Sequence, residues 1–263
     1  MGNIKVVNAL KLMQTFSAIG LFIAPVIASA FLFDVNPLAW LKLNVPPKAI
    51  QILLVLLTIL ISGPVINYMM ELNKHLSLPY TLKSLEEWMK NSEDQADELT
   101  KVFLEVSGAG GLLVNLFVIA LLPAIGEELL FRGGVQKLLI EATKNKHAGI
   151  ILAAIVFSAL HLQFYGFLPR MILGIYLGYL VLWSGSLWLA IIAHFINNAG
   201  AVILFFLQKR GQLSFDPDTI GTQAGDMMTL IISILFTVIF IRMTYKSGKH
   251  QPVLLQKSDD SLW

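Results

Sequence analysis

Long apolar stretches dominate this chain and constrain its fold more than any other feature. Charged residues make up 14% of the sequence and hydrophobic residues 56%, whereas a soluble domain has about 25% charged residues. A membrane-spanning helix needs about 20 apolar residues. About seven segments reach or approach that length: 9–33, 49–70, 102–125, 148–162, 168–183, 187–207 and 227–241. We therefore predict an all-α fold, a polytopic transmembrane bundle of about seven to eight helices.

The charge balance and the cysteine content exclude several classes of protein. The formal net charge is +2 and no basic patch stands out, so nucleic acid is not an expected partner. The sequence has no cysteine, which excludes disulfides, thiolate metal ligands and a cysteine nucleophile. We expect a multi-pass integral membrane protein surrounded by a lipid bilayer. We take this membrane to be a bacterial inner membrane.

One integral-membrane domain, residues 1–263, is expected, with two polar segments. Residues 71–101 are rich in charge and form an expected amphipathic surface connector, with a helix starting at the capping-box pair Ser84 and Glu87. Residues 246–263 form a polar C-terminal tail. Glycines at positions 108, 110 and 111, and at positions 174 and 178, favour close packing between helices.

Three apolar segments carry ionisable residues, which are costly inside a membrane and therefore mark a candidate site. Glu127, Glu128 and Arg132 follow one segment. Because Glu128 and Arg132 are separated by four residues, they share a helix face and can pair. Glu127 is rotated by about 100° from Glu128 on a helix, so it has no local partner.

The other two segments supply imidazoles and an amide. Phe157 and His161 share one helix face, and so do His194 and Asn198. A free carboxylate can take a proton from water, while imidazole and amide groups can stabilise an oxyanion. Each group alone is more simply explained as a paired polar residue or a helix-end anchor. The three together indicate a hydrolytic site.

The sequence here resembles the CPBP intramembrane proteases, which include the CAAX prenyl endopeptidases and the Abi or bacteriocin-processing proteins. The family pattern is Glu-Glu-x-x-x-Arg, then Phe-x-x-x-His, then His-x-x-x-Asn. This chain has Glu127-Glu128-x-x-x-Arg132, Phe157-x-x-x-His161 and His194-x-x-x-Asn198 in that order. The resemblance covers about residues 112–207, and the catalytic core helices are expected in residues 102–207.

The resemblance implies an intramembrane endopeptidase that cleaves a membrane-associated protein or peptide, with or without a prenyl group. Glu127 would be the general base, and His161 would help to hold the water. His194 and Asn198 would stabilise the oxyanion. Glu128 and Arg132 would be the structural pair, with Phe157 beside the imidazole.

Metal use is open at this point, because the residues are compatible with two mechanisms. His161, His194 and Glu127 would give the three protein ligands common in catalytic zinc sites. No HExxH pair is present, however, and a metal-free glutamate mechanism fits the same residues.

Four other interpretations were weighed. Ser186 could be the nucleophile of a rhomboid-type protease, but no Gly-x-Ser-x-Gly elbow surrounds it. Asp226 follows a glycine, but no second membrane aspartate is present for an aspartyl protease. The polar cluster could be the proton or ion relay of a transporter, although no inverted repeat is visible. A pseudo-protease that binds membrane-embedded partners would keep the same residues.

Overall fold

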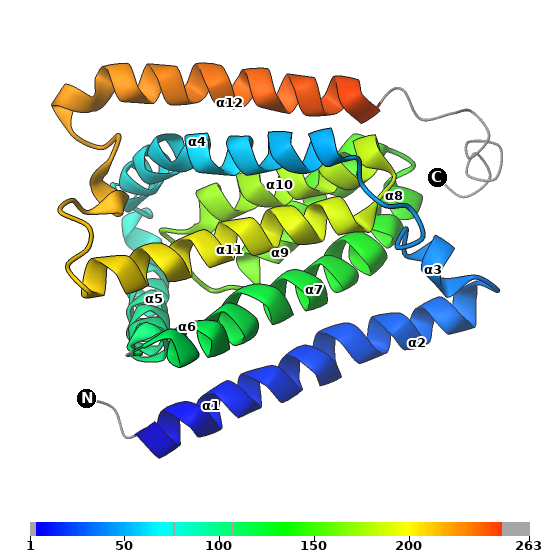
Figure 1. The fold of residues 1–263 in the computed structure, drawn as a ribbon, viewed down its shortest axis with the longest axis horizontal. Coiled ribbons are helices and arrows are strands. Elements are labelled where there is room, and N and C mark those ends of the chain that lie inside the picture. The colour runs from blue at the N-terminus through cyan, green and yellow to red at the C-terminus, as the bar shows by residue number, and fades with distance from the viewer. Residues whose placement is uncertain (1–3, 76, 107, 249–263) are drawn as a thin grey trace.

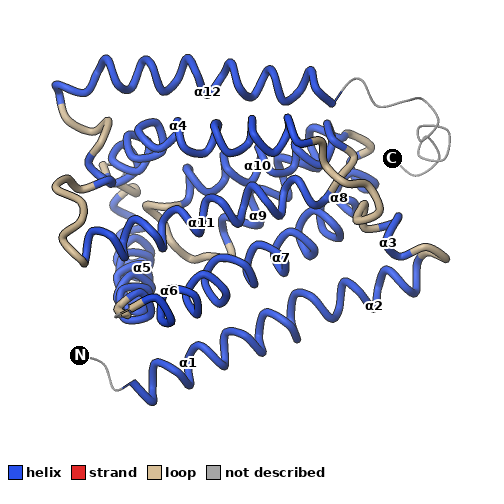
Figure 2. The backbone as a smooth tube through the Cα atoms, viewed as in Figure 1, coloured by secondary structure: helices blue, strands red, loops and turns tan. Residues whose placement is uncertain are grey.

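The structure is a computed structural model that describes residues 4–75, 77–106 and 108–248. These residues form helices joined by loops and contain no β-strand, so the predicted all-α class is confirmed (Figure 2). Figure 1 shows α12 (Met227–Gly248) on one side of the molecule and α1 (Ile4–Ser17) with α2 (Ala24–Phe33) on the other. The remaining long helices lie between them.

Six continuous helices of the described residues are long and apolar enough to cross a membrane: Lys5–Phe33, Ala49–Lys74, Ala109–Thr143, Phe167–Ser184, Leu187–Lys209 and Met227–Gly248. The second, fourth, fifth and sixth of these are α4, α10, α11 and α12. The first is made of α1, a π-helical turn (Ala18–Ile23) and α2. A seventh apolar helix, α9 (Lys146–Ala159), is shorter than a full span. The protein is an integral membrane protein.

The third predicted segment, 102–125, is misplaced at both ends. Residues 102–104 belong to α5 (Lys83–Leu104), and the spanning helix runs from Ala109 to Thr143. It consists of α6 (Ala109–Asn115), a π-turn (Leu116–Leu121), α7 (Leu122–Glu128), a second π-turn (Leu129–Val135) and α8 (Gln136–Thr143). Glu127 and Glu128 therefore lie inside this helix and do not mark its end.

Helix α11 is the central element of the bundle. It packs against α4, α7 and α10. Its buried side chains include Leu187, Leu189 and Ala193, which belong to the main hydrophobic core. Because α11 is enclosed in this way, His194 on the same helix is only 4% exposed. Packing of α11 in the core therefore places His194, one of the candidate site residues, in the interior of the bundle.

Glycine positions allow two helices, α9 and α10, to approach closely. A Cβ at Gly174 would lie 3.0 Å from the Ala154 Cβ, and one at Gly178 would lie 2.8 Å from the Ile150 Cγ2. The packing predicted for these two glycines is confirmed. It is wrong for Gly108 and Gly110, where a Cβ would meet nothing within 4 Å. Gly108 instead has a φ of +92° just before α6, a conformation that favours glycine.

The polar connector contains the 22-residue helix α5, preceded by a 3-10 turn (Tyr80–Leu82). The helix begins at Lys83, and no side chain caps its first turn, so the predicted capping box at Ser84 is wrong. At the C-terminus, residues 246–248 complete α12. The rest of the predicted polar tail, residues 249–263, lies outside the described residues.

The Gly149→Ala variant should be less stable than the wild type. A Cβ at this position would lie 2.7 Å from the Ile140 backbone nitrogen, so α8 and α9 would have to separate. We expect the free energy of unfolding to fall by about 1–3 kcal/mol, which thermal unfolding in detergent would measure. The control is Gly63→Ala, where a Cβ meets nothing within 4 Å. Equal unfolding temperatures for both variants would contradict this packing.

Candidate functional site

A buried ion pair lies at the centre of the site. The Arg132 Nη1 donates to the Glu128 Oε1 at 2.9 Å, and the Arg132 Nη2 donates to the Gly174 carbonyl at 2.9 Å. Glu128 is 0% exposed and Arg132 is 2% exposed. The pairing expected from the spacing is therefore formed. The bond from Arg132 to Gly174 also links the helix Ala109–Thr143, called the motif helix from here on, to α10. Arg132 further lies over the Phe157 ring, 4.8 Å from its centroid.

Glu128 has a second partner that the spacing argument did not identify. Its Oε1 lies 2.8 Å from the His194 Nδ1. Since a carboxylate accepts this hydrogen bond, the His194 Nδ1 carries the proton. Glu128 consequently orients the imidazole as well as pairing with Arg132. This link joins the motif helix to α11.

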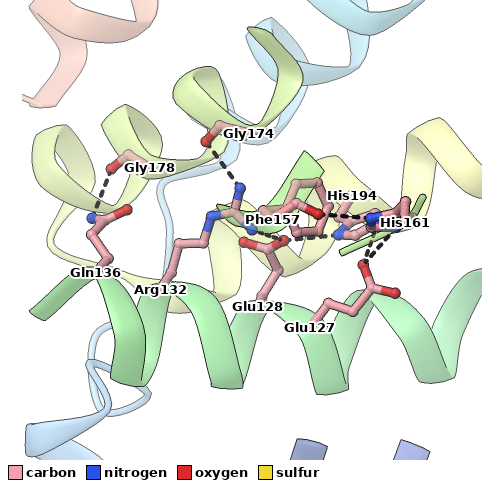
Figure 3. Close-up of polar contacts among 9 residues, drawn as sticks. All are labelled: Glu127, Glu128, Arg132, Gln136, Phe157, His161, Gly174, Gly178 and His194. Carbon is pink, nitrogen blue, oxygen red and sulfur yellow. Dashed lines mark hydrogen bonds and ion pairs between the residues drawn. The ribbon is translucent and has the colours of Figure 1, made fainter. Parts of the chain in front are cut away.

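Glu127 points to a different place from Glu128 (Figure 3). Its Oε2 lies 3.8 Å from the His194 Nε2 and 4.0 Å from the His161 Nε2. This oxygen is buried and has no hydrogen-bond partner among the described residues. The structure thus leaves one carboxylate oxygen facing two imidazole nitrogens, at distances that one small polar molecule can bridge.

His161 lies in a turn just after α9, which ends at Ala159, and not in the helix expected over 148–162. Its Nδ1 lies 2.8 Å from the Phe157 carbonyl oxygen. A carbonyl can only accept, so the proton is on Nδ1, and the Nε2 of the neutral ring is an acceptor. The Phe157 ring packs edge-on against both imidazoles, with its centroid 4.9 Å from that of His161 and 6.1 Å from that of His194. One aromatic side chain therefore contacts both histidines.

Asn198 is the site residue that the structure does not join to this cluster. Among the described residues, the Asn198 Oδ1 accepts a hydrogen bond from the Asn197 Nδ2 at 3.2 Å. It lies one turn after His194 on α11, and it is only partly buried. Pairwise contacts link six of the predicted residues into one cluster: Glu127, Glu128, Arg132, Phe157, His161 and His194.

The three residues named as possible zinc ligands, Glu127, His161 and His194, have suitable donor atoms. Both Nδ1 atoms are engaged by oxygen acceptors, which leaves both Nε2 atoms directed toward Glu127. Within the part of the chain that the structure describes, however, no group of three or more His, Cys, Asp or Glu residues is arranged to hold a metal ion.

Contacts with Asn73 and Glu93 hold the loop that follows His161, and the sequence analysis missed both residues. The Asn73 Nδ2 donates to the Phe164 and Tyr165 carbonyls. Glu93 accepts from backbone N–H groups of the same loop. Neither residue stands in a motif or inside an apolar segment. The sequence predicted only that Glu93 lies on an amphipathic helix.

The rival protease residues have structural roles. Ser186 is fully buried just before α11, and its Oγ donates to the Val45 carbonyl at 2.5 Å. Asp226 ends a 3-10 turn (Ala224–Asp226) directly before α12, and its Oδ2 accepts from the Gly221 N–H at 2.9 Å. Neither lies in the polar cluster described above.

A known protein family matches the helices that carry these residues. Residues 109–200 match the model of the type II CAAX prenyl endopeptidase Rce1-like family. The predicted family resemblance is confirmed over this segment. The matched residues start at the first residue of α6, end within α11 and include every motif position from Glu127 to Asn198. Helix α5 lies outside the Rce1-like match.

One curated protein matches part of the chain. The uncharacterized protein YpbD of Bacillus subtilis (strain 168) is 32% identical over 89 residues, which is 32% of this chain and 42% of YpbD. The match therefore spans less than half the length of that protein. No solved structure matches the chain significantly.

The two adjacent glutamates should differ sharply in their effect on stability. Glu128→Ala leaves the Arg132 guanidinium buried without the carboxylate that pairs with it. We expect the free energy of unfolding to fall by about 3–5 kcal/mol. Glu127→Ala removes an oxygen without a partner and should cost far less. Thermal unfolding of both variants in detergent measures the difference. A similar loss for both would show that the division between them is wrong.

Proposed function

We propose that this protein is an intramembrane endopeptidase in which Glu127 activates a water molecule for attack on a peptide bond. The observation that carries the proposal is the buried Glu127 Oε2, which faces the Nε2 atoms of His161 and His194 at 4.0 and 3.8 Å and has no hydrogen-bond partner among the described residues. The Rce1-like match over the same residues supports it at the level of the family.

The water would lie between Glu127 and His161. Both the ionised Glu127 carboxylate and the His161 Nε2 are acceptors, so one water can donate a hydrogen bond to each. Its lone pairs then face away from both groups. Glu127 takes one proton as the oxygen attacks the carbonyl carbon, and it gives that proton to the departing amine when the C–N bond breaks.

The oxyanion would be stabilised from α11. Because the His194 Nδ1 proton is bonded to Glu128, a hydrogen bond from Nε2 to the oxyanion requires a proton on both ring nitrogens. Asn198, one helical turn away, would supply an amide N–H as the second donor. In this mechanism Glu128, Arg132 and Phe157 hold the imidazoles in place and do not touch the substrate.

The proposed substrate is a membrane-associated protein or peptide. The family's description favours a prenylated C-terminal segment, and plain membrane peptides are the other class to be tested. The proposed location is a bacterial cell membrane, which the Bacillus relative supports.

The Glu127→Gln variant should lose at least about 10²-fold in peptide cleavage, because general-base catalysis contributes on that order. Purified protein in detergent would be assayed with farnesylated and unmodified membrane peptides. The matched control is Glu141→Gln, an exposed glutamate on the same long helix, which should cleave at the wild-type rate.

Two arms of this assay decide between the alternatives. Activity that survives a zinc chelator supports the metal-free mechanism, and activity abolished by the chelator and restored by zinc contradicts it. Absence of cleavage by wild-type protein on every peptide contradicts the protease assignment and favours a relay or a binding function.

A further inference from the structure

The loop between α9 and α10 carries His161 and is fastened to a helix outside the family match. Glu93 of α5 accepts a hydrogen bond from the Tyr165 N–H at 2.7 Å with its Oε2, and one from the Gly166 N–H at 3.2 Å with its Oε1. Glu93 is 7% exposed, and it is the one buried residue of α5. Both oxygens of a buried carboxylate are thus used on backbone groups just before α10.

The position of these bonds at the start of α10 adds to their strength. Gly166 is the residue immediately before the first residue of this helix. A negative charge at a helix N-terminus is favourable, because the helix dipole is positive there. Hydrogen bonds to a charged acceptor are also stronger than those between neutral groups. Glu93 therefore fixes where α10 begins.

Further bonds hold the same loop from other sides. The Asn73 Nδ2 of α4 donates to the Tyr165 carbonyl at 2.8 Å, and the Ser158 Oγ of α9 donates to the Phe167 carbonyl at 2.6 Å. A Cβ at Gly166 would lie 3.1 Å from both terminal nitrogens of Arg170, so this guanidinium packs directly on the loop backbone. The loop's C-terminal end is therefore fixed by groups on four helices.

Backbone strain lies beside His161 in this loop. Leu162 has a φ of +54°, in the left-handed region that a leucine rarely adopts. Such a conformation persists only where surrounding contacts impose it. The Phe157 carbonyl and ring contact the His161 ring on its other side, so the contacts after Leu162 are the second set that places the imidazole.

We propose that α5 is a latch for this loop and that Glu93 is a positioning residue, which sets the distance between His161 and Glu127. The inference rests on the proposed function, since it gives His161 the task of holding the attacking water. Figure 1 shows α5 crossing the ends of the spanning helices and not running along them. The latch therefore acts from the end of the bundle on a residue of the site.

The test compares Glu93→Ala and Glu93→Gln with Asp94→Ala, an exposed acid next in sequence. Loss of both bonds in Glu93→Ala should lower kcat by about 10²-fold, because small displacements of a catalytic group cost that much. KM should stay near the wild-type value. Glu93→Gln keeps one acceptor oxygen and should recover part of kcat, and Asp94→Ala should match the wild type.

Hydrogen exchange gives a readout that does not depend on cleavage. The Tyr165 and Gly166 amides should exchange faster in Glu93→Ala, while the amides of α11 keep their wild-type protection. An unchanged kcat in Glu93→Ala overturns the latch, and so does faster exchange throughout the protein with no recovery in Glu93→Gln. If the wild type cleaves nothing, the proposed function fails and the catalytic role of Glu93 fails with it.

Discussion

The buried contact between Glu128 and Arg132 is the interaction on which the rest of the site depends. Two charges inside a bundle that crosses a membrane cost far less when they are paired and bonded to further groups. Arg132 donates a second hydrogen bond to the Gly174 carbonyl of α10, and the Glu128 Oε1 also accepts from His194 of α11, while the Glu128 Oε2 has no hydrogen-bond partner among the described residues. The pair therefore fastens three helices together at one point.

This arrangement also separates the roles of two adjacent carboxylates. Glu128 uses its Oε1 on Arg132 and His194, and it is fully enclosed. Glu127, rotated around the same helix, has an oxygen that is aimed at two imidazoles and bonded to neither. Enzymes often place two like groups in environments that give them different tasks. Here the difference follows from which face of one helix each residue occupies.

Much of this could be predicted from the sequence, because it depends on short-range rules. Apolar length predicted the helices, and the four-residue spacing predicted the Glu128–Arg132 pair. The end of the third segment could not be predicted, because the charges at 127 and 128 interrupt the apolar pattern. Only the partners on α10 and α11 show that these charges are internal.

Contacts between distant segments explain what the sequence did not reveal. His161 lies beyond the end of α9, and the loop after it is bonded to Asn73 and Glu93, which precede it by many residues. Nothing in the local sequence of α5 distinguishes Glu93 from the exposed acids around it. The role of Glu93 became visible only when the fold placed it against the start of α10.

An experimental structure of the wild-type protein in a lipid nanodisc, at a resolution that shows ordered water, tests the central claim most directly. The account predicts one water within hydrogen-bond distance of both the Glu127 Oε2 and the His161 Nε2, with Glu128 bonded to Arg132 and His194. A direct bond between Glu127 and Arg132, or a metal ion held by Glu127, His161 and His194, would contradict it.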